Sequence, residues 1–353
     1  MSIKKRPSNK LIEVIIILSI IFMIGGFIGS IVEDRVNGDK SNIPSSQVIT
    51  SDKENSTEGN KDKISEINNK AEEIGEVPKL NEEVSKETKV TSGELKIHFI
   101  DVGQADSILI ENNGEAMLID AGNNADSDLV VNYIKDNNIK NIKYAIGTHP
   151  HEDHIGGLDK VIDNFHIETL YMPKATATTK TFKDVVTSAK NKGLSFTVPK
   201  IGEMFNLGGT TCTILAPNSE SYEEVNDNSI VIRLQYGDTS FLFTGDAEEL
   251  SEDEILNRGF DVKSTVLKVG HHGSDSSTSD KFLAAVNPDY AVIEVGKDND
   301  YGHPRQSIMD KLKSKGIKVY RTDEQGSIIA TSDGTTVKFN VEPGSYKGLT
   351  KGK

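Results

Sequence analysis

The stretch from Thr148 to Gly157 constrains this chain more than any other part of its sequence. Within it, six consecutive residues hold three histidines and an aspartate, although the whole chain has only eight histidines: His149, His151, Asp153 and His154. Imidazole and carboxylate groups suit zinc and similar first-row metals. Because neighbouring side chains of an extended segment point to opposite faces, His149 and His151 are expected to share one face, with Asp153 at the same spacing. His154 then points in a second direction, where a helix begins, so the stretch can serve two ions. The alternative is a polar loop whose histidines act only as caps or turn residues.

Four further polar patches end predicted strands and are candidates to complete this cluster. Asp120 closes an apolar run before a glycine turn, where a carboxylate can orient metal ligands from behind. Asp246 closes another such run, and its two oxygens can bridge two cations. His271 and His272 are adjacent, so they must point differently and only one is expected to be a ligand. His303 precedes a predicted helix and could supply a proton or contact a substrate oxygen. The alternatives are turn, cap or other structural roles.

Charge and cysteine usage exclude some classes of protein. The formal net charge of −14 gives no general attraction to nucleic acid, whose binding depends on Lys and Arg that neutralise phosphates, although a local basic groove is compatible with it. Cys212 is the only cysteine, so an intramolecular disulfide scaffold is excluded. It lies in a strand-like run with no base nearby in the sequence, which indicates a buried, inert thiol.

The N-terminus predicts a membrane anchor. Residues 1–10 are basic and precede an almost wholly apolar run at residues 11–32. At about 1.5 Å per residue, a helix of this length crosses a hydrocarbon core of roughly 30 Å. Basic residues before the span keep the N-terminus in the cytoplasm, so we predict a single-pass protein of the cell membrane with the rest of the chain outside. The alternative is a cleaved signal peptide and a secreted protein, because small residues at 26–30 offer a cleavage site.

The remainder divides by composition into a linker, one domain and a tail. Residues 33–93 are rich in Glu, Lys, Asn and Ser, and they cannot bury enough apolar surface to offset chain entropy. A disordered acidic linker is predicted there, with a docked subdomain as the alternative. From residue 94 to 345, β-like runs alternate with amphipathic helical stretches, which indicates an α/β domain of two sheets with helices on their outer faces. Gly237-Asp238 predicts a hairpin within it. Residues 346–353 are expected to be a frayed tail.

Six motifs, together covering residues 95–340, give this chain a resemblance to the metallo-β-lactamase superfamily. Within that superfamily they resemble the extracytoplasmic hydrolase domain of the ComEC family of DNA-uptake (competence) proteins. Besides the histidine stretch, the motifs are Phe99-Ile100-Asp101-Val102-Gly103-Gln104-Ala105-Asp106-Ser107, Asn226-Asp227-Asn228-Ser229, Thr244-Gly245-Asp246, His271-His272-Gly273-Ser274 and Tyr301-Gly302-His303-Pro304. The resemblance implies a four-layer αββα sandwich with metal ions in the cleft between the sheets.

The resemblance also implies a ligand set for two divalent ions, Zn²⁺ or alternatively Mn²⁺. His149 and His151 would hold the first ion, and Asp246 would bridge both. Asp153, His154 and His271 would hold the second ion. His272 is the alternative to His271. Many superfamily members supply a further histidine to the first ion. Only His166 lies in the matching region, and it belongs to no motif, so Asp227 is the candidate to replace that histidine.

The chain differs from the ComEC family in its architecture. Proteins of that family also carry a many-helix channel region and an oligonucleotide-binding-type domain, whereas this sequence shows one apolar span and a linker. It therefore resembles the hydrolase domain alone on a tether and is not expected to form a channel by itself. Secreted relatives of similar pattern include a phosphorylcholine esterase that acts on teichoic acids, so the substrate stays open.

The implied reaction is metal-assisted hydrolysis, in which two cations activate a water and polarise the substrate. Asp153, Asp246 and His303 are the residues expected to take part in catalysis. A phosphodiester is the preferred substrate, because two close cations can clamp the attacking and leaving oxygens. Two enzyme hypotheses compete: a nuclease acting on DNA, and a phosphorylcholine-esterase-like hydrolase of envelope polymers. A metal-stabilised scaffold protein is the alternative that is not an enzyme.

Overall fold

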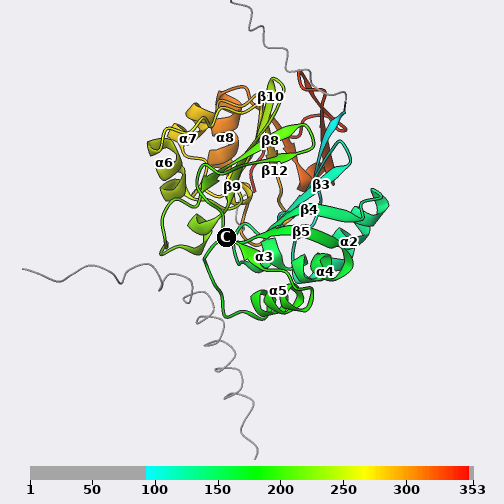
Figure 1. Cartoon of the computed structure of the whole chain (residues 1–353). Helices are drawn as coiled ribbons and strands as arrows, with labels where there is room; N and C mark the ends of the chain where they lie inside the picture. Colours follow the sequence, from blue (N-terminus) through cyan, green and yellow to red (C-terminus); the bar gives the residue numbers. More distant parts are fainter. Residues whose placement is uncertain (1–92, 350–353) are drawn as a thin grey trace, which may run out of the picture. The chain divides into compact units, whose positions relative to one another are not determined.

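The computed structural model describes residues 93–349, which form two mixed β-sheets with helices on their outer faces (Figure 1). The predicted anchor at residues 11–32 and nearly all of the predicted linker at residues 33–93 lie outside the described residues. Between residues 93 and 349, no helix combines the length and the apolar character needed to cross a membrane.

The first sheet has eight strands and the second has seven. In spatial order, the first sheet consists of β15 (Val337–Phe339), β14 (Ile328–Ser332), β1 (Leu95–Phe99), β2 (Ile108–Asn112), β3 (Glu115–Ile119), β4 (Asn141–Ile146), β5 (His166–Tyr171) and β6 (Phe196–Thr197). The second consists of β13 (Lys318–Arg321), β12 (Tyr290–Ile293), β11 (Val266–Lys268), β10 (Thr239–Phe243), β9 (Val231–Tyr236), β8 (Thr210–Ala216) and β7 (Met204–Leu207). Strands β3 to β6 are parallel in the first sheet, as are β10 to β13 in the second.

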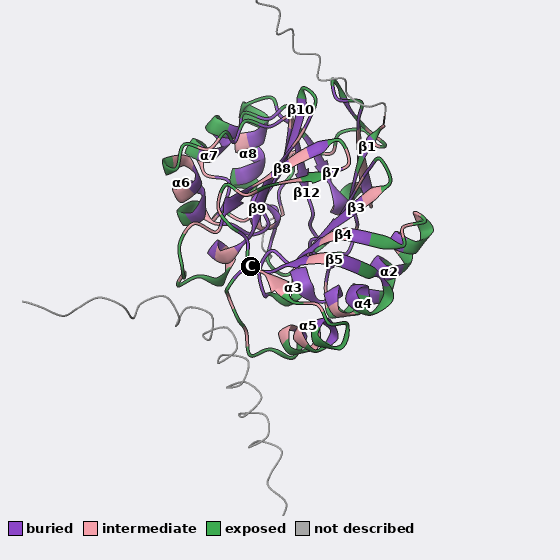
Figure 2. Ribbon diagram, viewed as in Figure 1, coloured by how far each residue is buried: buried purple, intermediate pink, exposed green. Residues whose placement is uncertain are grey.

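Three apolar cores separate four layers, as the predicted αββα sandwich requires. Side chains of both sheets meet in a central core. A second core lies between the first sheet and α2 (Ser127–Asp136), α4 (Leu158–Asn164) and α5 (Lys180–Asn191). A third lies between the second sheet and α6 (Glu249–Asn257), α7 (Asp280–Val286) and α8 (Gln306–Ser314). Figure 2 shows the strands mostly buried and the outer faces of the helices exposed. The sandwich is therefore confirmed for the described residues.

Alternation along the strands explains this layering. In β10, Phe241 and Phe243 belong to the central core, whereas Leu242 between them packs into the core beneath the helices of the second sheet. Successive side chains of a strand point to opposite faces, so a strand covered on both faces must be apolar throughout. The continuous apolar run of β10 is the result.

The predicted hairpin at Gly237-Asp238 is confirmed. Tyr236 of β9 pairs with Thr239 of β10 across the two-residue turn. Gly237 has a φ of 57°, and a Cβ at this position would lie 2.4 Å from the carbonyl oxygen of Gly334. Glycine is needed here both for the left-handed backbone conformation and for the close approach of the neighbouring loop.

The ends of parallel strands deliver the candidate functional residues. Strands β3 and β4 are neighbours, and they end just before Asp120 and the histidine stretch. Strands β10 and β11 are neighbours in the other sheet, and they end just before Asp246 and His271. The carboxyl ends of parallel strands meet at one edge of a sheet, where ligands bind in α/β proteins.

Residues 346–349, the described part of the predicted tail, contact the domain. The amide of Leu349 donates to the carbonyl oxygen of Pro304 at 2.9 Å. The buried guanidinium of Arg321 donates to the carbonyl oxygens of Ser345 and Lys347. The Tyr346 side chain also packs against the core beneath the second sheet's helices, and its hydroxyl donates to the carbonyl oxygen of Ile317 at 2.6 Å.

Gly156 allows a close approach beside the short helix α3 (Glu152–Ile155). Its backbone is helical, with φ −58° and ψ −45°, but a Cβ would lie 2.2 Å from backbone atoms of Asn123 and Asn124. Gly156→Ala is therefore expected to destabilise the fold by about 1–3 kcal/mol in urea unfolding, as overpacking does. Gly344→Ala is the control, since the nearest atoms there end flexible side chains. Equal losses in the two variants would contradict tight packing at Gly156.

Candidate metal centre

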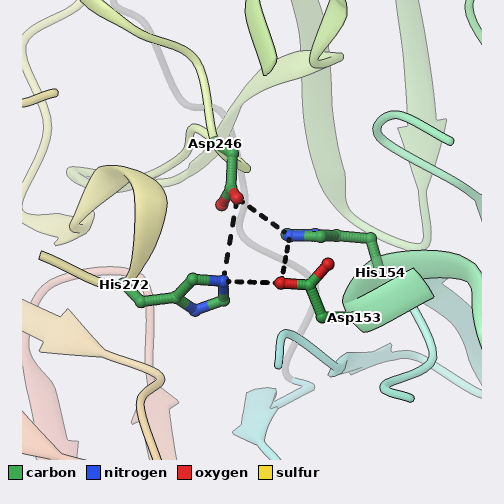
Figure 3. A group of neighbouring side chains, drawn as sticks. All are labelled: Asp153, His154, Asp246 and His272. Carbon is green, nitrogen blue, oxygen red and sulfur yellow. Dashed lines mark ion pairs between the residues drawn. The ribbon is translucent and has the colours of Figure 1, made fainter. Parts of the chain in front are cut away.

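Four side chains from both sheets converge on one point (Figure 3). Asp153 and His154 come from α3, Asp246 follows β10, and His272 lies in the 3-10 turn η3 (Gly270–Gly273). One ligand atom of each lies within 4.8 Å of those of the others. Asp246 Oδ2 is 3.1 Å from His154 Nε2 and 3.7 Å from His272 Nε2. Asp153 Oδ2 is 3.4 Å from His272 Nε2.

Asp120 holds His154 from behind. Its Oδ2 accepts hydrogen bonds from His154 Nδ1 at 2.8 Å and from Thr148 Oγ1 at 2.7 Å, and its Oδ1 accepts from the Thr148 amide at 2.8 Å. This arrangement keeps the proton on Nδ1 and leaves Nε2 facing Asp246. Burial lowers the pKa of His154, but the carboxylates of Asp246, Asp120 and Asp153 outweigh it and hold that pKa well above its usual value. Asp120 thus lies behind His154, and its role in orienting a metal ligand stays a prediction.

His272 is oriented in the same way by a second buried group. Its Nδ1 donates to the carbonyl oxygen of Glu294 at 2.9 Å and lies 3.2 Å from Asp106 Oδ1. Burial opposes a charge on this imidazole, but Asp246 and Asp106 together raise the pKa of His272 to about 10. Without a metal ion, the imidazole is therefore a cation between carboxylates, with its Nε2 directed at Asp153 and Asp246.

A buried ion pair joins the two sheets behind His272. Asp106 lies between β1 and β2, Lys268 ends β11, and Lys268 Nζ is 2.8 Å from Asp106 Oδ2. Burial raises the pKa of Asp106, but Lys268 and His272 outweigh it and hold that pKa below its usual value. Burial and the Asp106 carboxylate raise the pKa of Glu294 well above its usual value, which favours its neutral form beside Asp106. The pair therefore fixes a loop of the first sheet against a strand end of the second.

His149 and His151 form a second group next to Asp246. His149 Nε2 is 3.0 Å from His151 Nδ1 and 4.0 Å from Asp246 Oδ2. The other nitrogen of His149 faces the hydroxyls of Thr148 at 3.2 Å and Ser229 at 3.3 Å. Burial, helped by the charge of a neighbouring histidine, holds the pKa of His149 well below its usual value. This imidazole is therefore neutral at physiological pH, as a metal ligand must be.

These groups face a cavity of about 340 Å³. Its lining consists of Gln104, His151, Glu152, Asp153, Asn226, Asp246, His271, His272, Tyr301 and His303. This lining contains three carboxylates and neither lysine nor arginine. His303 thus faces the same space as the candidate ligands, and the ring of Tyr301 stacks on it with the centroids 5.9 Å apart.

The structure does not bring Asp227 to the cluster. Its Oδ1 instead accepts hydrogen bonds from the amides of Glu248 at 3.1 Å and Ser251 at 3.2 Å, at the start of α6. Free amides in the first turn of a helix are a favourable partner for a carboxylate, so capping takes this side chain away from the expected ligand position. His166 is the exposed first residue of β5.

The residues present fit a divalent metal ion. His154 Nε2, His272 Nε2 and Asp246 Oδ1 are buried and make no hydrogen bond to any residue from 93 to 349. Buried polar atoms normally have hydrogen-bond partners, so three atoms without one in a single cluster indicate that a bound group belongs there. Imidazole nitrogen and carboxylate oxygen are the donors that Zn²⁺ and related ions take. His154, His272, Asp153 and Asp246 would hold such an ion.

Sequence patterns assign no role to Asp106, Lys268 or Glu294. Each lies in or beside an apolar strand, and Asp106 also falls inside one of the six motifs. Lys268 carries the one sign of such a role, because it ends an apolar strand, and a lysine is almost never fully buried unless it is paired with an acidic group. The sequence does not reveal that partner, since Asp106 and Lys268 belong to different sheets.

Asp120→Asn is expected to weaken metal binding by about 10–100-fold, as loss of a supporting carboxylate does. The amide cannot accept from Thr148 and His154 as the carboxylate does, so the orientation of His154 is loosened. Competition with a chromogenic chelator measures the change. Asp184→Asn is the matched control, because Asp184 is a surface carboxylate paired with Lys180. Unchanged affinity in Asp120→Asn would contradict the supporting role.

Comparison with known proteins identifies the family. The family model described as "Metallo-beta-lactamase superfamily" matches residues 100–296, more than half of the chain. ComE operon protein 3 of Bacillus subtilis is 28% identical over 270 residues, covering 71% of this chain and 35% of that protein. Competence protein ComA of Neisseria gonorrhoeae is 26% identical over 249 residues, covering 68% and 32%. Recombination protein 2 of Haemophilus influenzae is 31% identical over 239 residues, covering 66% and 28%.

The chain thus spans about a third of the length of these curated relatives. The relatives are competence proteins of the ComEC family, which confirms the resemblance inferred from the six motifs. The family match also covers the part of the chain that holds the candidate ligands, from His149 to His272, and the groups behind His272. With the two-sheet sandwich, it shows that this chain belongs to the metallo-β-lactamase superfamily.

Proposed function

We propose that this chain is a metal-dependent phosphodiesterase, tethered to the cell membrane with its hydrolase domain outside, and that its substrate is DNA. One observation carries the proposal. Buried imidazole and carboxylate atoms that make no hydrogen bond within residues 93–349 converge at the wall of a cavity of about 340 Å³. Such a site holds metal next to a space large enough for a substrate, which is the arrangement of metal-assisted hydrolysis.

The roles of the residues follow from their positions. When bound, two divalent ions would supply Lewis-acid activation of a water and of a phosphoryl oxygen. Asp246 sets the spacing of the two ligand groups, because its Oδ2 lies 3.1 Å from His154 and 4.0 Å from His149. Asp153 faces the cavity and would take part in the same site. Asp120 positions His154 without touching substrate.

Charge in the cavity favours a phosphodiester over a phosphate monoester. The lining holds Glu152, Asp153 and Asp246, with no basic side chain to neutralise a phosphate. Bound metal ions would neutralise one negative charge of a phosphate, but the second charge that a monoester carries near pH 7 would find no lysine or arginine in the lining, whereas a diester has no such second charge. Among diesters, DNA is favoured because the matched relatives are named as competence and recombination proteins.

His303 would contact substrate as a neutral imidazole. Burial, together with the charges of His271 and His272, lowers the pKa of His303 to about 4. Bound cations would lower that pKa further. The ring is therefore a hydrogen-bond partner for a substrate oxygen near pH 7, and not an imidazolium acid.

A second candidate substrate is a phosphorylcholine ester of an envelope polymer. Tyr301 lines the cavity with 62% of its surface exposed, and the carboxylate of Glu152 lines the same space. An aromatic face beside a carboxylate is suited to a quaternary ammonium group. The outward-facing location predicted from residues 11–32 would give this enzyme access to the envelope.

Hydrolysis of synthetic esters tests the proposal. The purified full chain, supplied with Mn²⁺ or Zn²⁺, is expected to cleave bis-p-nitrophenyl phosphate faster than p-nitrophenyl phosphate. Release of nucleotides from single-stranded DNA would support the nuclease, and release of choline phosphate from p-nitrophenylphosphorylcholine would support the second candidate. Tight metal binding without turnover of any ester would overturn both and favour a metal-stabilised scaffold.

A further inference from the structure

One carboxylate oxygen is surrounded by four imidazoles. Asp246 Oδ2 lies 3.1 Å from His154 Nε2, 3.7 Å from both His271 Nε2 and His272 Nε2, and 4.0 Å from His149 Nε2. All four rings thus direct the same type of nitrogen at the atom that would bridge two ions. Sequence reasoning allowed only one ligand from the adjacent pair, but here both members of the pair face Asp246.

An unusual backbone makes this convergence of neighbours feasible. His271 and His272 both have left-handed conformations, with φ values of 47° and 52°. Consecutive non-glycine residues in this region are strained, and such strain concentrates at functional sites. Their rings lie 6.1 Å apart at an interplanar angle of 65°. His272 is buried within the four-residue cluster, whereas 24% of the His271 side chain is exposed at the cavity.

The groups behind the rings divide the four histidines into two pairs. His154 Nδ1 is held by Asp120, and His272 Nδ1 is held by the Glu294 carbonyl beside Asp106. These two histidines also share Asp153, whose Oδ2 is 3.8 Å from one Nε2 and 3.4 Å from the other. They form one ligand group together with Asp153.

The other pair shares one neighbouring loop, which consists of the 3-10 turn η2 (Val225–Asn228) and the residue after it. Ser229 Oγ lies 3.3 Å from His149 Nδ1. Asn226 Nδ2 donates to Glu248 Oε1 at 3.0 Å, and that oxygen lies 3.3 Å from His271 Nδ1. A carboxylate that accepts the Nδ1 proton leaves Nε2 free to bind metal. His149 Nδ1 also lies 3.2 Å from Thr148 Oγ1, and His271 Nδ1 lies 3.1 Å from Ser276 Oγ. The loop therefore contributes to the orientation of both rings together with these two hydroxyls.

We propose that His271 is the third histidine ligand of the first ion, so that the adjacent His271 and His272 serve different ions. The first ion takes His149, His151 and His271, the second takes Asp153, His154 and His272, and Asp246 lies between them. The loop that carries Asp227 supplies no ligand and instead supports two. This assignment rests on the proposed metal-dependent function and deepens it.

Counting bound ions in variants of the full chain tests the assignment without any substrate. Asparagine is used at position 271 because it tolerates a left-handed backbone. The first site is weakened by His151→Asn and the second by Asp153→Asn, two side chains that line the cavity. Co²⁺ is added to metal-free protein, and the tightly bound ions are counted after gel filtration. The absorption spectrum of bound Co²⁺ reports which ligand environment remains.

The wild type is expected to keep two ions and His271→Asn to keep one. His151→Asn with His271→Asn should also keep one, because both changes affect the same ion. Asp153→Asn with His271→Asn should keep none. Each lost site is expected to be weakened by more than about 100-fold, since even supporting groups contribute about 10–100-fold. Asp227→Asn should keep two ions, because the Asp227 carboxylate accepts hydrogen bonds from amides at the start of α6 and binds no ion in this assignment.

The opposite pairing would overturn the proposal. If Asp153→Asn with His271→Asn keeps one ion while His151→Asn with His271→Asn keeps none, His271 belongs to the second ion. If His271→Asn keeps two ions with unchanged affinity and spectrum, it is not a ligand. Loss of one ion in Asp227→Asn would return the ligand role to Asp227. The counts stand whether or not the protein hydrolyses a phosphodiester, so failure of the proposed activity is distinguishable.

Discussion

Asp246→Asn is expected to abolish hydrolysis of bis-p-nitrophenyl phosphate and to release tightly bound metal. Its carboxylate is 1% exposed, and its Oδ2 faces both ligand groups. An amide carries no charge and offers one oxygen, so it cannot hold two cations together. The loss in kcat/KM should exceed the factor of about 10–100 typical of supporting residues. Steady-state kinetics and metal analysis of the same preparation measure both effects.

Asp253→Asn is the matched control for this variant. Asp253 is a partly exposed carboxylate on α6 that pairs with Lys281, so its loss should leave turnover and metal content unchanged. Circular dichroism establishes that both variants fold. Turnover at the wild-type rate in a folded Asp246→Asn protein would show that the carboxylate does not link the two ligand groups.

Lys268→Met is expected to cause the largest loss of stability. Lys268 and Asp106 are each 1% exposed and lie 2.8 Å apart, so methionine would leave a buried carboxylate without its cation. Breaking a buried ion pair in this way costs about 3–5 kcal/mol. At roughly 2–4 °C per kcal/mol for a domain of this size, the melting temperature should fall by about 10 °C. Differential scanning calorimetry measures the change.

Two further variants show whether the loss arises from the unpaired charge. Lys281→Met removes the cation of the surface pair with Asp253 and should cost less than about 1 kcal/mol. Asp106→Asn combined with Lys268→Met removes both charges and should recover part of the stability. A double variant no more stable than Lys268→Met alone would mean that packing, and not the ion pair, determines the loss.

The sequence predicts most of the fold because the central strands are covered on both faces. A strand such as β10 must then be apolar throughout, and Gly237-Asp238 marks its turn unambiguously. The same reasoning places Asp120 and Asp246 at strand ends, where the structure also has them. The local sequence pattern is sufficient to predict the structure wherever burial and turn geometry alone determine it.

The remaining features depend on contacts between distant residues. Asp106 and Lys268 become partners only when the sheets pack, and no spacing in the chain encodes that pairing. Asp227 was assigned by its place in a motif, yet the amides at the start of α6 take its carboxylate. The direction of His271 likewise depends on two left-handed residues, which the sequence did not indicate.

Diester hydrolysis measured against bound metal tests the central claim most directly. Metal-free full-length protein is titrated with Mn²⁺, the bound ions are counted by mass spectrometry, and cleavage of bis-p-nitrophenyl phosphate is followed at each step. The rate is expected to rise with occupancy, to level off at two ions per chain, and to vanish on chelation. A rate independent of bound metal, or two bound ions without hydrolysis, would contradict a metal-dependent phosphodiesterase.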